Sequence, residues 1–231
     1  MTTAPASLNI EAYVVDADRP AIIAGAEQLS ECLGEAAGVG AWPLRLNVRA
    51  PGATPPPGET PSAIVVSLLP EIIAMGEPIA ETDARWRAYL DSLLATGAPV
   101  LLCTIFRHVA HRPRDGQPSP LLERIRRLNR MAIDLSHDLG VGIVDIDRAL
   151  THIGGSVLQT DYRLGGVLAA EVGGHTLAWA LLSFGLDEAI DPTLQEAAKG
   201  VLGGLQQIDT VVNRRLQRRR AAAAGSAPAG G

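Results

Sequence analysis

The chain has 231 residues, of which 47% are hydrophobic, 19% charged and 3% aromatic. This composition is typical of one globular domain with a sizeable core, and it excludes wholesale disorder. The longest apolar runs are far too short to cross a bilayer, and the N-terminus lacks the basic and apolar segments of a secretory signal. Because the two cysteines, Cys32 and Cys103, make no disulfide framework, we expect a soluble, cytoplasmic protein without a membrane span.

The net charge of −5 is unevenly distributed along the chain. From Thr193 onward there are six basic and two acidic residues, a local balance of +4, so the rest of the chain carries −9. An acidic body repels the phosphate backbone of nucleic acids. We therefore expect no specific nucleic-acid partner.

Short apolar runs rich in β-branched residues alternate with longer stretches of helical period. This alternation is typical of an α/β domain with a mostly parallel sheet. The apolar runs predict strands at 8–15, 43–48, 63–69, 100–105 and 142–146, and the helical stretches predict helices at 20–37, 83–96, 120–139 and 167–184. We predict a three-layer αβα fold around a mostly parallel five-stranded sheet of flavodoxin-like type, followed by a C-terminal helical extension.

Four segments are expected along the chain: a flexible N-terminus at 1–7, the α/β domain at 8–191, the helical extension at 192–220 and a disordered low-complexity tail at 221–231. Apolar residues in the extension are spaced alternately four and three apart from Leu194 to Val212. Glycines at 200, 203 and 204 weaken a helix there, so the seam needs a partner surface. That surface is either the chain's own domain or another chain. We expect self-association or a protein partner through residues 194–216.

In an open parallel sheet, ligands bind beyond the carboxyl ends of the strands. The expected loops there carry both charge signs, and the candidate ligand-binding residues are Asp16, Asp18, Arg107, His108 and Arg163. Asp16 and Asp18 are suitable hard ligands for Mg²⁺, but capping of the following helix is the favoured interpretation. No metal cluster or dinucleotide motif is visible in the sequence, so we expect neither metal nor cofactor.

Several phrases of the sequence resemble one enzyme family over residues 8–185. They are Leu128-Asn129-Arg130 followed by Leu135-Ser136-His137, then Gly142-Ile143-Val144-Asp145, and the ending Thr160-Asp161-Tyr162-Arg163 with Gly174-His175-Thr176-Leu177-Ala178. With the order of the elements, these phrases resemble the SGNH (GDSL-type) hydrolases. The resemblance implies an SGNH-like αβα topology. It also implies a serine nucleophile after the first strand, an oxyanion-binding asparagine after the third, and an aspartate followed three residues later by the catalytic histidine.

All three functional positions differ in this chain. The stretch after the first strand contains Ala17 where the serine is expected, and 67–71 contains no asparagine. Asp161 matches the aspartate, but Leu164 stands at the histidine position. Losing the nucleophile, the oxyanion donor and the base together makes ordinary serine hydrolysis improbable.

Two functions follow from the resemblance and its departures. The favoured one is an SGNH-like domain without catalysis, acting as a binding or assembly partner in a bacterial biosynthetic system. The alternative is an atypical ester or acetyl hydrolase, in which Ser67 is the nucleophile, His175 or His108 is the base, and Asp161 completes the catalytic set.

Overall fold

The computed structural model describes residues 7–56, 58, 60–72, 75–107, 119–153 and 167–204. The predicted flexible N-terminus, except Ser7, and the chain after Gly204 lie outside these ranges. So do three of the candidate site residues, His108, Asp161 and Arg163.

The centre of the molecule is a five-stranded sheet in which every pair of neighbouring strands is parallel. The spatial order is β2-β1-β3-β4-β5. This confirms the predicted three-layer α/β fold with its parallel sheet. Several strands end earlier than predicted; β3 stops at Ser67 because the chain turns into a short 3-10 helix, η1, at Leu69–Ile72. The strands are β1 (Leu8–Tyr13), β2 (Leu44–Arg49), β3 (Ala63–Ser67), β4 (Val100–Cys103) and β5 (Gly142–Val144).

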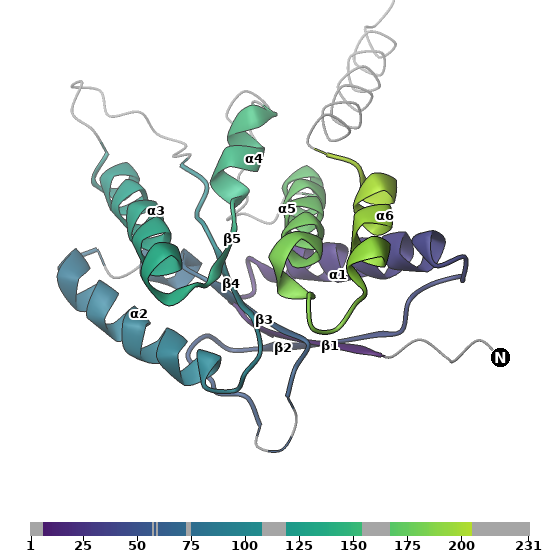
Figure 1. Ribbon diagram of the computed structural model, residues 1–231. Coiled ribbons are helices and arrows are strands. Elements are labelled where there is room, and N and C mark those ends of the chain that lie inside the picture. The colour runs from purple at the N-terminus through teal and green to yellow at the C-terminus, as the bar shows by residue number, and fades with distance from the viewer. Residues whose placement is uncertain are drawn as a thin grey trace, which may run out of the picture.

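Helices cover both faces of the sheet. In Figure 1, α1, α5 and α6 lie on one side of the strands, and α2 and α3 lie on the other. Proline occupies the first turn of α1, α3 and α6, where its missing N–H costs no hydrogen bond. The helices are α1 (Arg19–Ala36), α2 (Ile79–Leu94), α3 (Pro120–Leu139), α4 (Ile146–His152), α5 (Val167–Ala180) and α6 (Pro192–Leu202).

The helices differ from the sequence prediction at several boundaries and by one additional helix. Helix α2 begins at Ile79, four residues before the predicted start, and α5 passes after Ala180 into a π-helical turn, η3 (Leu181–Gly185). Helix α4 was not predicted; Asp145 caps it by accepting a hydrogen bond from the backbone N–H of Arg148 at 3.0 Å. Seven residues are too few to show a helical period, which is why the pattern did not reveal α4.

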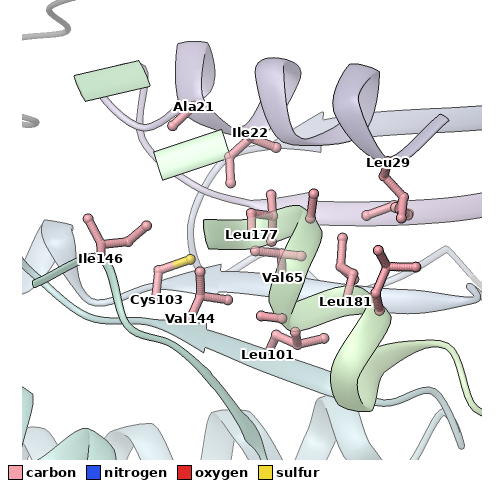
Figure 2. Packing of buried hydrophobic residues seen from close by; sticks show 14 of the residues in the cluster. Ala21, Ile22, Leu29, Val65, Leu101, Cys103, Val144, Ile146, Leu177 and Leu181 are labelled. Carbon is pink, nitrogen blue, oxygen red and sulfur yellow. The ribbon is translucent and has the colours of Figure 1, made fainter. Parts of the chain in front are cut away.

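The sheet separates two apolar clusters. The larger one joins the strands to α1, α4, α5 and α6, and the smaller one joins them to α2 and α3. Figure 2 shows Ile22 and Leu29 of α1 and Leu177 of α5 meeting Val65 and Leu101 of the strands. Buried parallel strands are apolar on both faces, which is why these runs read as continuous in the sequence.

Helix α6 packs against the domain. Its Ala198 is fully buried in the larger cluster, and Leu194 and Val201 pack against the same cluster. The amide of Gln195 donates to the carbonyls of Leu186 (3.4 Å) and Ile190 (2.8 Å). In its described part, the apolar seam therefore docks on the chain's own domain. Among the described residues, none of the helices has the length and apolar character needed to cross a membrane.

Candidate functional site

A cavity of about 300 Å³ lies at the carboxyl ends of β1 and β3. These two adjacent strands are where the strand order reverses, because β1 connects to β2 on one side while β3 lies on its other side. In open α/β sheets, ligands bind in the crevice at this switch point. The last residues of both strands, Tyr13 and Ser67, line the cavity, with Glu71, Arg85, Trp86 and Tyr89.

The phenol of Tyr13 is the most unusual group in this cavity. The side chain is only 1% exposed, and its hydroxyl has no hydrogen-bond partner among the described residues. Burial raises the pKa of Tyr13, and the nearby Glu11 carboxylate adds to this effect while Arg49 opposes it. The phenol is therefore neutral at physiological pH, and it can both donate and accept a hydrogen bond. A buried hydroxyl without a partner costs free energy, so the site favours a ligand that supplies one.

Aromatic side chains of α2 form one wall of the cavity. The rings of Trp86 and Tyr89 meet edge to face at a centroid distance of 5.7 Å and an interplanar angle of 76°. The hydroxyl of Tyr89 donates to the carbonyl of Ala53 at 3.1 Å. Burial raises the pKa of Tyr89 to about 12, with a further contribution from Tyr13. Both phenols therefore present neutral, largely apolar faces to the cavity.

The floor of the cavity holds a buried carboxylate that is already fully engaged. Arg85 donates to both oxygens of Glu71 at 2.9 and 2.8 Å, and the indole N–H of Trp86 donates at 2.9 Å. Burial alone would raise the pKa of Glu71, but the hydrogen bonds from Arg85 and Trp86 outweigh it, and the pKa lies below its usual value. Arg85 also contacts Glu77 at 2.9 Å. The charges around the cavity compensate one another, so Glu71 is a poor general base.

A second hollow, of about 570 Å³, adjoins the first and shares Pro51 and Pro70 with it. It is lined by the stretch after β1, including Asp16, Ala17 and Arg19. Asp16 is almost fully exposed and pairs with Arg19 at 3.3 Å. Ala17, at the position where the resemblance implies a nucleophile, therefore faces an open pocket with an apolar methyl group.

Ser67 does not have the surroundings of a nucleophile. Its side chain is 2% exposed, and its Oγ accepts a hydrogen bond from the backbone N–H of Leu69 at 3.1 Å. Among the described residues, no histidine or carboxylate is hydrogen-bonded to Ser67. Activation of a serine requires a base in hydrogen-bonding reach. Ser67 shapes the cavity and stabilises the turn into η1.

His175, the expected alternative base, lies on α5. Helix α5 packs on α1, on the opposite side of the sheet from α2. Burial lowers the pKa of His175, and the backbone of Gly203, at the end of α6, partly offsets this. The imidazole is therefore neutral and belongs to the packing of α5 near the end of α6. Asp161, the third member of the hypothetical set, lies outside the described residues.

The other candidate ligand-binding residues lie apart from one another. Asp18 occupies the N-cap position of α1 and is fully buried, without a capping hydrogen bond from its side chain. Arg107 lies in a separate pocket beyond β4 and β5. The described residues contain no group of three His, Cys, Asp or Glu side chains arranged to hold a metal ion. Of the rim predicted from the sequence, Asp16 and Arg107 thus face different pockets.

The residues that the sequence did not reveal are Tyr13, Arg85, Trp86 and Tyr89. Aromatic residues are rare in this sequence, because Trp, Tyr and Phe together account for only eight positions. Three of these eight side chains line this one cavity. Trp86 and Tyr89 are also spaced three apart, which places them on one face of a helix.

Fold and site together define a doubly wound α/β protein with an aromatic pocket at its switch point. Comparison with models of known families, with curated proteins and with solved structures finds no match to this chain.

Proposed function

We propose that the protein is a non-catalytic, SGNH-like binding domain that takes a small neutral molecule into the cavity between β1 and β3. The observation that carries this proposal is Tyr13, a residue that lines the cavity and whose buried hydroxyl has no hydrogen-bond partner among the described residues. The strand order β2-β1-β3-β4-β5 is compatible with the SGNH-like topology implied by the sequence.

The lining favours a ligand with a planar apolar part and one hydrogen-bonding group. Tyr13, Trp86 and Tyr89 provide flat apolar walls, for which stacking and edge contacts are favourable. Glu71 and Arg85 neutralise each other, so a charged ligand would enter without a free counter-ion at these two groups. A volume of about 300 Å³ suits a single ring with a short substituent.

Binding is favoured over hydrolysis because the parts of a hydrolytic site are not joined. Ala17 offers no nucleophile, Ser67 has no base among the described residues, and the carboxylate of Glu71 is held by Arg85 and Trp86. The remaining polar atom, the Tyr13 hydroxyl, is protonated and suited to orienting a ligand.

The test is a binding titration with four neutral single-ring probes: benzamide, phenol, benzyl alcohol and toluene. Saturation-transfer NMR and tryptophan fluorescence report binding, the latter through Trp86. We expect at least one hydrogen-bonding probe to bind. We expect Tyr13→Phe to weaken it about fivefold, because one hydrogen bond to a neutral group is lost. Toluene makes no such bond, so its affinity should not fall in the variant.

Three results would contradict the proposal. The first is the absence of binding by every probe, and the second is equal binding to the wild type and Tyr13→Phe. The third is steady hydrolysis of p-nitrophenyl acetate that Ser67→Ala abolishes, which would establish the hydrolase alternative. Ser92→Ala, an exposed hydroxyl on α2 outside the cavity, is the matched control for Ser67→Ala.

A further inference from the structure

We propose a second binding site, for a phosphate ester, in the pocket beyond the carboxyl ends of β4 and β5. This pocket has a volume of about 600 Å³. Four arginines line it, namely Arg107 after β4, Arg126 and Arg130 on α3, and Arg148 on α4. The concentration of guanidinium groups is notable because the whole chain carries a net charge of −5.

The two aspartates of the pocket are already engaged. Asp147 is largely buried. It accepts a hydrogen bond from the backbone N–H of Arg107 at 2.8 Å and forms an ion pair with the Arg107 guanidinium at 2.6 Å. Asp145 accepts from the backbone N–H of Arg148 at 3.0 Å and from the hydroxyl of Thr104 at 3.3 Å. These carboxylates hold the ends of β4 and β5 together, so they do not neutralise the arginines of α3.

Two guanidinium groups are left without a carboxylate. Among the described residues, the side chains of Arg126 and Arg148 have neither an ion pair nor a hydrogen bond. Arg130 pairs with Asp134 at 3.2 Å within its own helix, and its side chain is 75% exposed. Exposed pairs of this kind are weak, so Arg130 can turn to a ligand at little cost.

Helical geometry brings these charges to one surface. Arg126 and Arg130 are four residues apart on α3 and therefore lie on the same face. Arg148 lies on α4, which lines the same pocket as α3. Planar guanidinium groups supplied to one pocket by two elements suit the oxygens of a phosphate monoester, with which they form paired hydrogen bonds.

The apolar part of the lining indicates what the phosphate is attached to. Ile133 on α3 is 56% exposed although it is a large aliphatic residue, and Ile143 of β5 lies in the same pocket. A free inorganic anion would leave these surfaces uncovered. A phosphate ester with an apolar or aromatic group would cover them, and the volume is sufficient for such a molecule.

The experiment is isothermal titration calorimetry of the full chain with phenyl phosphate and with inorganic phosphate. We expect phenyl phosphate to bind more tightly, because inorganic phosphate lacks the apolar group that would cover Ile133 and Ile143. Arg126→Gln and Arg148→Gln should each weaken phenyl phosphate about tenfold, the loss expected for a charge-assisted hydrogen bond.

Arg127→Gln is the matched control, because it changes the net charge equally. Arg127 is adjacent on α3, pairs with Glu123 and is absent from the pocket lining. It should change the affinity less than twofold. Equal weakening in all three variants would mean general charge attraction only, and would overturn the site. Absence of phenyl phosphate binding, or binding unaffected by Arg126→Gln and Arg148→Gln, would overturn it as well.

The proposals for this site and for the aromatic cavity can be refuted independently of each other. Tyr13→Phe should leave phenyl phosphate affinity unchanged, because Tyr13 lines the other cavity. A loss of phenyl phosphate affinity in Tyr13→Phe would show that the probe occupies the switch-point cavity, and it would contradict the second site. Tight binding of a short single-stranded RNA in competition with phenyl phosphate would also contradict it, in favour of a nucleic-acid surface.

Discussion

At the residue scale, Glu71 joins the two ends of the connection between β3 and α2. It lies in η1, directly after β3, yet the three hydrogen bonds to its carboxylate come from Arg85 and Trp86 of α2. The buried guanidinium of Arg124 on α3 donates to the Glu71 carbonyl at 3.3 Å and to the Glu77 carbonyl at 2.6 Å. This polar network sets the position of the aromatic wall against the ends of β1 and β3.

Replacing Glu71 with glutamine should lower the free energy of unfolding at pH 7 by about 2 kcal/mol, the size of charge-assisted hydrogen bonds to a buried group. The folded-state pKa of Glu71 lies below its unfolded value near 4.5. Its contribution is therefore complete above pH 4.5 and is lost as the pH falls through the folded-state pKa. Urea unfolding of wild type and variant from pH 7 to pH 3 should show the difference between them narrowing.

Glu123→Gln is the control for this pH dependence, because Glu123 forms a more exposed pair with Arg127. Its effect on stability should be under about 0.5 kcal/mol. If Glu71→Gln and wild type lose stability in parallel as the pH falls, the ionised carboxylate of Glu71 does not stabilise the fold.

The two phenols of the aromatic cavity should respond differently to removal of their hydroxyls. Tyr89→Phe loses the hydrogen bond to Ala53, so unfolding should become easier by about 1 kcal/mol. Tyr13→Phe removes a buried hydroxyl that has no partner among the described residues, so its stability should equal or exceed that of the wild type. Urea denaturation of the two variants, without ligand, measures this. A larger loss in Tyr13→Phe than in Tyr89→Phe would mean that the Tyr13 hydroxyl has a stabilising partner.

At the scale of elements, α1 and α5 approach each other closely at two glycines, Gly25 and Gly174. A Cβ placed on Gly174 would lie 2.7 Å from the backbone nitrogen of Gly25 and 2.8 Å from the Cβ of Ala24. A Cβ on Gly25 would lie 2.9 Å from the carbonyl oxygen of Gly174. Since these contacts are with backbone atoms and with a Cβ attached directly to the backbone, neither helix can accommodate a side chain without moving. The helix pair that covers one face of the sheet therefore depends on both glycines.

We expect Gly174→Ala to lower the free energy of unfolding by about 3 kcal/mol, because the added methyl group forces α1 and α5 apart. Gly200→Ala is the matched control on α6, where a Cβ would meet nothing within 4 Å. Alanine should raise stability there by up to about 1 kcal/mol, as in an open helical position. Thermal unfolding followed by circular dichroism separates the two outcomes. A neutral Gly174→Ala would show that the close approach of α1 and α5 is not required.

At the scale of the whole molecule, the sheet was predictable because its strands are buried on both faces. The run at 63–67 is entirely buried and entirely apolar except for Ser67, so it needed no periodicity to be recognised. The edge strand β2 was predicted as one of the short apolar runs, and its polar residues Asn47 and Arg49 donate to the buried Glu11 of β1 at 2.8 and 2.7 Å. The ends of helices and strands were less predictable, because they are set by single hydrogen bonds, such as the one that the Asp145 side chain accepts at the start of α4.

The candidate site was only partly predictable, because it is assembled from segments that the sequence separates. Asp16 and Ser67 were predictable from their positions at strand ends, a rule that depends on topology alone. Trp86 and Tyr89 come from the second turn and later part of α2, and nothing local to them indicates that they face the end of β1. Likewise, the absence of a bonding partner for Tyr13 is a property of the packed structure.

The C-terminal segment can be divided by two truncations, because its first half is part of the packing. Ending the chain after Asp191 removes Ala198 from the core and the two hydrogen bonds of Gln195, so cooperative unfolding should weaken or disappear. Ending it after Gly204 keeps these contacts, and unfolding should match that of the full chain.

The remaining apolar seam, from Leu205 to Val212, lies outside the described residues and carries the prediction of self-association. Light scattering should therefore show an oligomer for the full chain and a monomer for the chain that ends at Gly204. Monomer masses for both the full chain and the chain ending at Gly204 would contradict self-association.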